Sequence, residues 1–263
     1  MEKTKEPFLS VVMPAYNEER TLETIVSKVL VIPGLLELIL IDDCSNDKTP
    51  EIAQQLADMD PRVRYFRQAK NSGKTEALKT GISLSKGSVV IIQDADLEYD
   101  PADIPDIIEP ISLGHADVVF GSRFMVKRAA RVLYFYHYLA NKGLTFFSNC
   151  LTNINLSDVE TCYKAFSGDI IRNMNITSRG FGFEIEVAAK VAKLGCAIYE
   201  VPINYYGRTY EEGKKIVFRD GVDALWYIVK FNLFVNLADS FSQRPALRAN
   251  QNKTLTSGRD QEV

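Results

Sequence analysis

Residues 89–92 form an apolar run, Val-Val-Ile-Ile, that changes directly into spaced carboxylates at Asp94, Asp96, Glu98 and Asp100. Such a run indicates a buried strand, and open α/β sheets bind ligands just beyond the carboxyl ends of their strands. Carboxylate oxygens suit Mg²⁺ or Mn²⁺, which often take one or two protein carboxylates together with substrate phosphates. The segment therefore predicts a cation and phosphate site at a sheet edge. An acidic turn that only ends a strand is the alternative.

Strand-like and helix-like segments alternate through the first half of the chain. The predicted strands, including a late one near residue 200, cover residues 8–13, 36–41, 63–66, 89–92, 118–120 and 197–201. Segments between them carry apolar residues at helical spacing, as at Leu22, Ile25 and Val29. This alternation predicts an α/β fold with a mostly parallel central sheet flanked by helices. Ligand-binding loops should then follow the strand ends.

The length of 263 residues suits one α/β domain with a C-terminal helical appendage. We expect the domain to cover residues 1–215. An amphipathic helix over 216–239 should pack on the domain or on a membrane surface, and the polar, aperiodic tail 240–263 should be disordered.

Charge and cysteine usage exclude several classes of protein. The net charge of −3 argues against a nucleic-acid partner, which would normally need a basic excess. Four scattered cysteines without C-x-x-C spacing predict neither a disulfide framework nor a zinc site, and fit a reducing compartment. The charged N-terminus has no signal-peptide pattern, and no apolar stretch reaches the roughly 18 residues of a membrane span. We therefore expect a cytoplasmic protein, in which any membrane contact is peripheral or through a partner.

The first two strand ends carry side chains suited to a nucleoside. Tyr16 can stack on a base, and Asn17 or Glu18 can hydrogen-bond to a ribose or base. A carboxylate at Asp43, after the second strand, can accept from a ribose hydroxyl or a base N–H. Helix-capping turns are the alternative at both places.

Basic residues follow later strands. Residues 71–75, Asn-Ser-Gly-Lys-Thr, resemble a phosphate loop, but the P-loop spacing fails because position 68 is Gln. Lys74 is therefore expected to pair with a nearby carboxylate. Arg123 ends a strand on the edge that carries the acidic cluster, so it suits a phosphate, with a surface charge as the alternative. The segment 208–215 predicts either a lid over a diphosphate or a solvated loop.

From Leu9 to about Val222 the chain resembles the family 2 glycosyltransferases with a GT-A (Rossmann-like) fold. It is most similar to their dolichol-phosphate mannose synthase and polyprenyl-phosphate glycosyltransferase branch. The resemblance rests on eight ordered motifs, SVVMPAYNEE (10–19), LIDDCSNDKT (40–49), NSGKTEAL (71–78), QDADLEYDP (93–101), FGSRF (120–124), DVETCYKAF (158–166), FGFEIE (181–186) and EVPINYYGRTYEEGKK (200–215).

The resemblance implies a role for each matching position. The nucleoside-holding positions are Pro14, Tyr16, Glu18, Ile41 and Asp43. The nucleotide and metal motif is Asp94, Ala95 and Asp96, with Glu98 as a third metal ligand where many relatives carry Gln. The basic residues that grip the donor diphosphate and the acceptor phosphate are Arg123, Arg208 and Lys214. Together with Asp96, these three basic residues are the expected catalytic groups.

The implied activity is inverting, metal-dependent transfer of a hexose (mannose or glucose) from GDP-mannose or UDP-glucose to polyprenyl phosphate, either dolichyl or undecaprenyl, with Mg²⁺ or Mn²⁺. A lipid phosphate is already anionic, whereas a hydroxyl acceptor needs a general base. The Q-x-x-R-W motif of processive polysaccharide synthases is absent, because Trp226 has no Arg before it. The basic and aromatic stretch 127–147 is expected to meet the polyprenyl chain at the cytoplasmic face of a membrane, with an ordinary buried helix as the alternative.

Two other functions stay open. A family 2 enzyme acting on a saccharide or small-molecule hydroxyl would use Glu160 or Glu184 as its base. A non-catalytic nucleotide-sugar-binding subunit is the second, although the Asp94–Asp96 pair argues against it. A nucleotidyltransferase is disfavoured, because the Gly-rich, Arg-containing N-terminal loop of that class is missing. The sequence leaves the donor sugar, the carrier lipid and the oligomeric state open.

Overall fold

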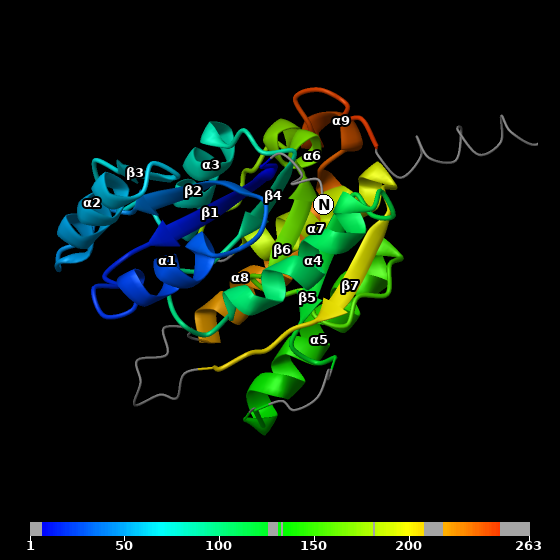
Figure 1. Cartoon of the computed structure of the whole chain (residues 1–263). Coiled ribbons are helices and arrows are strands. Elements are labelled where there is room, and N and C mark those ends of the chain that lie inside the picture. Colours follow the sequence, from blue (N-terminus) through cyan, green and yellow to red (C-terminus); the bar gives the residue numbers. More distant parts are fainter. Residues whose placement is uncertain (1–6, 126–130, 133, 181, 208–217, 248–263) are drawn as a thin grey trace, which may run out of the picture.

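A seven-stranded sheet forms the centre of the molecule in the computed structural model (Figure 1). The structure describes residues 7–125, 131–132, 134–180, 182–207 and 218–247, and for residues 218–220 it describes the backbone only. Its strands are β1 (Leu9–Ala15), β2 (Leu35–Asp42), β3 (Val63–Arg67), β4 (Val89–Ile92), β5 (Val118–Ser122), β6 (Lys164–Ser167) and β7 (Ile198–Pro202). The spatial order is β3-β2-β1-β4-β6-β5-β7, and only β6 runs antiparallel to its neighbours. The prediction of a mostly parallel α/β sheet is confirmed.

Helices cover both faces of this sheet. They are α1 (Leu22–Leu30), α2 (Thr49–Met59), α3 (Lys74–Leu84), α4 (Ile104–Ser112), α5 (Phe135–Thr152), α6 (Gly168–Asn173), α7 (Phe183–Leu194), α8 (Phe218–Val229) and α9 (Leu237–Ser240), with a 3₁₀ turn η1 (Pro101–Asp103) and a π-helical turn η2 (Lys230–Phe234). Side chains alternate across β1, so that Val11 and Met13 pack with α1, α2 and α4 while Val12 packs with α3. Two buried cores result, one on each face.

The strand order reverses beside β1. The chain moves from β1 outward to β2 and β3, and then returns to pair β4 with the other side of β1. Ligands of open α/β sheets bind at such a switch point, beyond the carboxyl ends of the strands. The loops after β1 and β4 are therefore brought together at one edge.

The short strand β6 was not predicted, because Lys164 interrupts its apolar pattern. The Lys164 side chain is buried, and its ammonium donates to the carbonyl oxygens of Val159 and Thr161 and lies 5.0 Å from the centre of the Phe120 ring. A charged residue can occupy the strand because these acceptors replace water.

The C-terminal region differs in part from the expectation. The prediction of disorder from residue 240 is wrong for residues 240–247, because Phe241 is buried and pairs with Met174 while the Ala246 amide donates to Asp169. Residues 248–263 lie outside the described residues, and the domain boundary at 215 stays a prediction. In the described part of the chain, no helix combines the length and apolarity that a membrane crossing requires.

Candidate functional site

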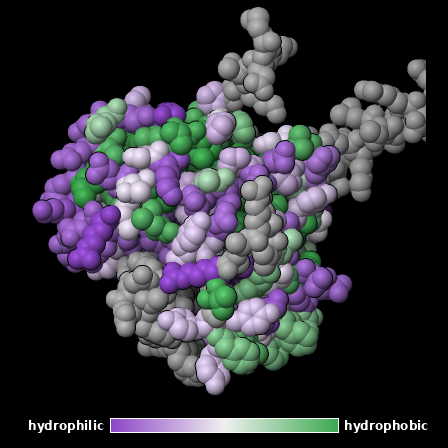
Figure 2. All heavy atoms as spheres, turned by 60° about the horizontal axis from the view of Figure 1, so that its bottom comes forward, coloured by the Kyte–Doolittle hydropathy of each residue, from purple (hydrophilic) through white to green (hydrophobic). Residues whose placement is uncertain are grey.

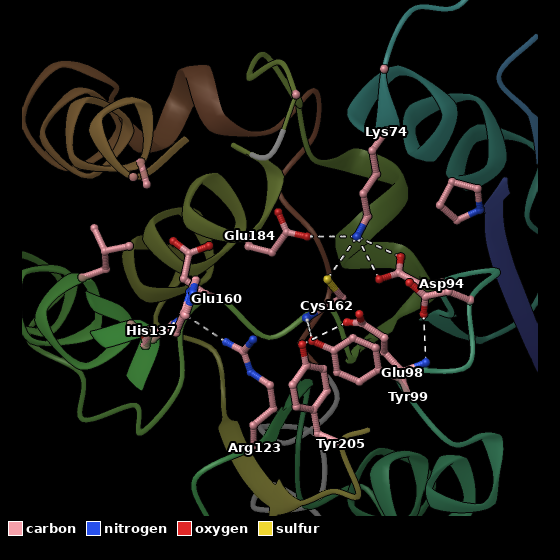
Figure 3. A pocket seen from close by; sticks show the side chains of 18 of the residues that line it. Lys74, Asp94, Glu98, Tyr99, Arg123, His137, Glu160, Cys162, Glu184 and Tyr205 are labelled. Carbon is pink, nitrogen blue, oxygen red and sulfur yellow. Dashed lines mark hydrogen bonds and ion pairs between the residues drawn. The ribbon is translucent and has the colours of Figure 1, made fainter. Parts of the chain in front are cut away.

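A pocket of about 1000 Å³ lies where the loops after β1, β2 and β4 meet α3, α5, α7 and α8 (Figure 3). The predicted site residues that line it are Pro14, Tyr16, Glu18, Asp43, Asp94, Ala95, Asp96, Glu98 and Arg123. Residues from distant parts of the sequence meet here because the parallel strands end at the same edge. The structure thus brings most of the predicted site together.

Two predicted nucleoside contacts lie elsewhere. Ile41 is completely buried in the core between the sheet and α3, because its position in β2 directs it toward that helix. Asn17 adopts a positive φ of 55°, and its amide oxygen accepts from the Asn46 amide, so it joins two loops. Neither is among the residues that line the pocket.

Asp43 shapes the loop that begins α3. Its two carboxylate oxygens accept from the backbone amides of Ser72, at 2.8 Å, and Gly73, at 2.7 Å. Gly73 has a φ of +89°, a conformation that favours glycine. Asp43 therefore fixes the direction in which the next residue, Lys74, enters the pocket.

Lys74 joins the acidic groups of the pocket. Its Nζ lies 2.8 Å from Asp94 Oδ1, 3.1 Å from Cys162 Sγ and 3.5 Å from Glu184 Oε1. Burial alone would lower the pKa of Lys74, but Asp94, Cys162 and Glu184 together outweigh this effect, and the pKa is raised well above its usual value. Lys74 is therefore a fixed positive charge, and its predicted pairing with a carboxylate is confirmed.

The three predicted metal ligands face the pocket but have different partners. Asp94 pairs with Lys74, Asp96 Oδ1 accepts from the Glu98 amide at 3.0 Å, and Glu98 Oε2 accepts from the Tyr205 hydroxyl at 2.9 Å. Among the described residues, no three His, Cys, Asp or Glu side chains converge as a ready metal cluster. The oxygen donors present fit a hard cation that takes one or two carboxylates and completes its coordination with substrate phosphates.

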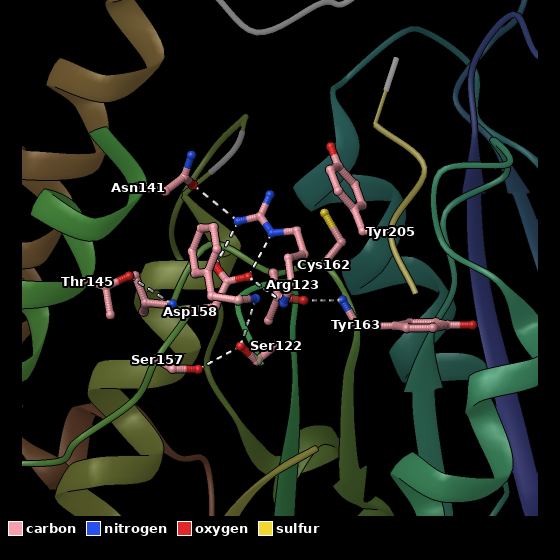
Figure 4. A network of polar contacts seen from close by, with 12 residues as sticks. Ser122, Arg123, Asn141, Thr145, Ser157, Asp158, Cys162, Tyr163 and Tyr205 are labelled. Carbon is pink, nitrogen blue, oxygen red and sulfur yellow. Dashed lines mark hydrogen bonds and ion pairs between the residues drawn. The ribbon is translucent and has the colours of Figure 1, made fainter. Parts of the chain in front are cut away.

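Arg123 lines the pocket and is held by a network of polar contacts (Figure 4). Its Nε and Nη2 each donate to a different oxygen of Asp158, both at 2.7 Å, and Nη2 also donates to Asn141 Oδ1 at 3.1 Å. The guanidinium lies 5.3 Å from the centre of the Tyr205 ring, and the side chain is 9% exposed. The alternative of a surface charge is therefore wrong.

Two further carboxylates line the pocket. Within the described part of the chain, Glu160 Oε1 and Glu184 Oε2 are buried and have no hydrogen-bond partner. Burial raises the pKa of Glu160 to about 7, and repulsion from the Glu184 carboxylate adds to the effect. From the sequence, Glu160 and Glu184 were predicted only as bases for a hydroxyl acceptor.

The sequence profile of Glycosyl transferase family 2 matches residues 10–174, which include the strand-end loops of the pocket. This chain is a family 2 glycosyltransferase. The curated dolichol-phosphate mannosyltransferase of Pyrococcus furiosus is 31% identical over 212 residues, which make up 78% of this chain and 58% of that protein. The chain thus spans less than two thirds of that relative. Polyprenol monophosphomannose synthase of Mycolicibacterium smegmatis is 27% identical over 75% of this chain and 77% of its own length.

Solved structures with the same fold include glucosyl-3-phosphoglycerate synthase from Mycobacterium tuberculosis. Its complex with Mn²⁺, UDP and phosphoglyceric acid has a TM-score of 0.68 and 19% sequence identity, and the match covers 88% of this chain and 80% of that one. At this identity the likeness establishes the fold, and the fold of this glycosyltransferase is GT-A.

Two predicted site residues of the glycosyltransferase lie outside the described residues, and two tyrosines of the pocket were not predicted. Arg208 and Lys214 lie outside the described residues, so their expected roles stay predictions. Tyr99 and Tyr205 line the pocket with ring centres 5.2 Å apart, and neither was among the site residues predicted from the sequence. The aromatic pair at 205–206 within the motif 200–215 was the signal that could have found Tyr205.

Replacing Glu160 by Gln is expected to change how stability depends on pH. The pKa of this carboxyl is raised from 4.5 to about 7 on folding, so between these values the folded state binds more protons than the unfolded state. The free energy of unfolding therefore falls as pH rises through this range, by on the order of 3 kcal/mol for this group, and no further above it. Urea denaturation of both proteins from about pH 4.5 to pH 8 measures the difference. A difference that stays constant with pH would contradict the assignment.

Proposed function

We propose that this glycosyltransferase transfers a hexose, mannose or glucose, from GDP-mannose or UDP-glucose to polyprenyl phosphate with inversion at the anomeric carbon. The relatives named for dolichol phosphate and polyprenol support the acceptor, and the solved complexes with Mn²⁺ and UDP support the donor class. The observation that carries the proposal is the pocket itself. It connects the strand-end loops of the sheet to two helices, α5 and α8, with exposed apolar faces.

The donor would lie against the carboxyl ends of β1, β2 and β4. Tyr16 and Glu18 line the end of the pocket assigned to the nucleoside, where Asp43 orders the adjoining loop. Asp96, with Asp94 or Glu98, would hold Mg²⁺ or Mn²⁺ beside the diphosphate. A bound cation supplies positive charge that stabilises the departing nucleoside diphosphate. The contact with Lys74 holds the Asp94 carboxylate in place for this task.

The acceptor would approach from α5 and α8, which pack against each other. In the described chain, α5, α8 and η2 expose many large apolar and aromatic side chains. They are called the apolar surface below, and they include Phe135, Tyr136, Leu139, Phe146, Phe147, Leu225, Trp226, Leu233 and Phe234. Figure 2 brings this end of the molecule forward, and hydrophobic side chains gather on its lower part. Tyr136, Phe147 and Leu225 also line the pocket. A lipid whose chain contacts the apolar surface could therefore place its phosphate in the pocket.

Replacing Phe135 and Trp226 by Ser is expected to weaken binding to vesicles of anionic phospholipid by about a hundredfold or more, because each aromatic side chain that enters the interface contributes roughly 1.5–3 kcal/mol and about 1.4 kcal/mol corresponds to a factor of ten. Sedimentation with vesicles measures this binding. The matched control replaces Val31 and Met59 by Ser; these residues are 79% and 80% exposed, compared with 67% for Phe135 and 58% for Trp226, and belong to the α1–α2 side of the molecule. Equal losses in both double variants would contradict a membrane role for the apolar surface.

Comparing polyprenyl phosphate with polyprenol tests the acceptor class. If the proposal is right, only the phosphate accepts labelled sugar in detergent, because the phosphate is already anionic and needs no base. Transfer to a hydroxyl is the second candidate function, and it is favoured by Glu160, whose raised pKa of about 7 suits a general base. Labelling of polyprenol or of a lipid-free hydroxyl in place of the phosphate would overturn the first proposal.

A further inference from the structure

Two buried carboxylate oxygens of the pocket have no partner in the described part of the chain. They are Oε1 of Glu160, in the segment before β6, and Oε2 of Glu184, in the first turn of α7. Leaving a buried polar atom without a hydrogen bond costs free energy, so native proteins contain few such atoms. Two of them on the wall of one pocket indicate that a bound molecule supplies the missing donors.

Glu160 and Glu184 together are called the acidic wall of the pocket. Lys74 fixes where this acidic wall lies relative to the metal motif. Its ammonium is held between Asp94, at 2.8 Å, and Glu184, at 3.5 Å. In Figure 3, Glu184 and Glu160 lie on the opposite side of the Lys74 ammonium from Asp94. In a nucleotide sugar the hexose follows directly after the diphosphate. A donor with its diphosphate at Asp94 and Asp96 can therefore extend its hexose toward the two glutamates.

The two carboxylates of the acidic wall favour a ligand with several hydroxyl groups. Ionised carboxylates only accept hydrogen bonds, and hexose hydroxyls are donors that bind them well. A phosphate would be repelled, since it brings negative charge next to two carboxylates. The acidic wall therefore suits the sugar and opposes the diphosphate and the acceptor phosphate.

We propose that Glu160 and Glu184 bind hydroxyl groups of the donor hexose and so determine which sugar the enzyme accepts. This inference rests on the proposed nucleotide-sugar donor. Lys164 acts as a positioning residue, because its buried ammonium donates to the carbonyl oxygens of Val159 and Thr161, the two residues that flank Glu160. That anchoring holds the Glu160 backbone in place at the pocket.

The burial of Glu160 agrees with such a role. Desolvation, and then the neighbouring Glu184, raises the pKa of Glu160 to about 7, while Lys164 and Arg123 act in the opposite direction. Hydroxyl donors from a sugar would stabilise its ionised form. Binding of the sugar would therefore replace the hydration that the Glu160 carboxylate lost on folding.

Calorimetric titration of wild type, Glu160→Gln and Glu184→Gln tests the inference. The probes are GDP, GDP-mannose, UDP and UDP-glucose, all with Mn²⁺. For each pair, the Kd of the nucleoside diphosphate is divided by the Kd of the nucleotide sugar, and this ratio is compared between variants. We expect each variant to lower this ratio by about tenfold, as the loss of a hydrogen bond to a charged group predicts. Glu76→Gln is the matched control; this half-exposed residue of α3 pairs with Lys79, and its replacement should leave the ratio unchanged.

Thermal unfolding of the same variants separates a lost contact from a lost fold. Each Gln variant should unfold at the same temperature as wild type or higher without ligand, because it replaces a buried carboxylate that lacks a full set of partners. A folded variant with an unchanged Kd ratio overturns the sugar-binding role. An unchanged Kd ratio combined with loss of transfer to a lipid-free hydroxyl also overturns it, because the replaced glutamate would then act as a base. Failure of wild type to bind either nucleotide sugar would instead refute the proposed function.

Discussion

Replacing Asp158 by Ala is expected to lower the free energy of unfolding by about 3–5 kcal/mol, because the Arg123 guanidinium would remain buried without its counter-charge. Asp158 accepts from Nε and Nη2 of Arg123 at 2.7 Å and also from the Arg123 amide at 3.1 Å. The carboxylate itself is completely buried. Arg123 lines the pocket but its side chain is only 9% exposed, so solvation offsets only part of the loss. Urea denaturation measures the change.

A second arginine–aspartate pair provides the control for this prediction. Arg62 and Asp60 approach to 2.7 Å, as Arg123 and Asp158 do, but their side chains are 41% and 22% exposed. Asp60→Ala should therefore cost only about 0–1 kcal/mol, the range of surface ion pairs. If the two variants were destabilised equally, burial would not be the factor that makes the Arg123 network strong.

Replacing Asp96 by Ala is expected to reduce sugar transfer by at least about 10²–10³-fold, the size of effect seen when a group that stabilises developing charge is removed. Asp96 lines the pocket directly after β4, where a cation and a diphosphate would meet. Its side chain also accepts from the Glu98 amide, so the loop should loosen slightly while the core of the fold is preserved. Initial rates with labelled donor measure the loss.

Asp100→Asn is the matched control for Asp96, because both belong to the acidic segment after β4. Asp100 caps the turn η1 and pairs with Lys28 at 3.4 Å, and it is not among the residues that line the pocket. Its replacement should leave the transfer rate within about twofold of wild type, since exposed ion pairs contribute little. Similar losses in both variants would mean that the acidic segment acts through its fold rather than through Asp96.

The sequence predicted the sheet and its ligand edge because these follow from local patterns. Apolar runs such as 89–92 identify buried strands, and the polar residues after them must then meet at one edge. Strand β6 was not predicted, because the buried Lys164 donates to acceptors that only the folded chain brings near it, and a local sequence pattern does not indicate such contacts. Ile41 was assigned to the nucleoside by resemblance, whereas its place in β2 directs it into the core.

The contacts between side chains in the site were harder to predict from the sequence than the residues that form the site. Lys74 was expected to pair with some carboxylate. Its simultaneous contact with Asp94, Cys162 and Glu184 joins α3 to segments about 20, 90 and 110 residues away, namely the loop after β4, the segment before β6 and the first turn of α7. Arg123 was placed correctly at the sheet edge, yet its bond to Asp158 depends on the segment that precedes β6. Side-chain pairing of this kind follows from the assembled fold.

Transfer of labelled sugar to polyprenyl phosphate in detergent tests the central claim most directly. GDP-mannose and UDP-glucose are offered separately to wild type and Asp96→Ala, each with Mn²⁺ or with EDTA. We predict label in the lipid phase from one of the two donors with wild type and Mn²⁺, and its loss with EDTA or in the variant. Nucleotide-sugar binding with no labelled lipid under any condition would contradict transfer to polyprenyl phosphate.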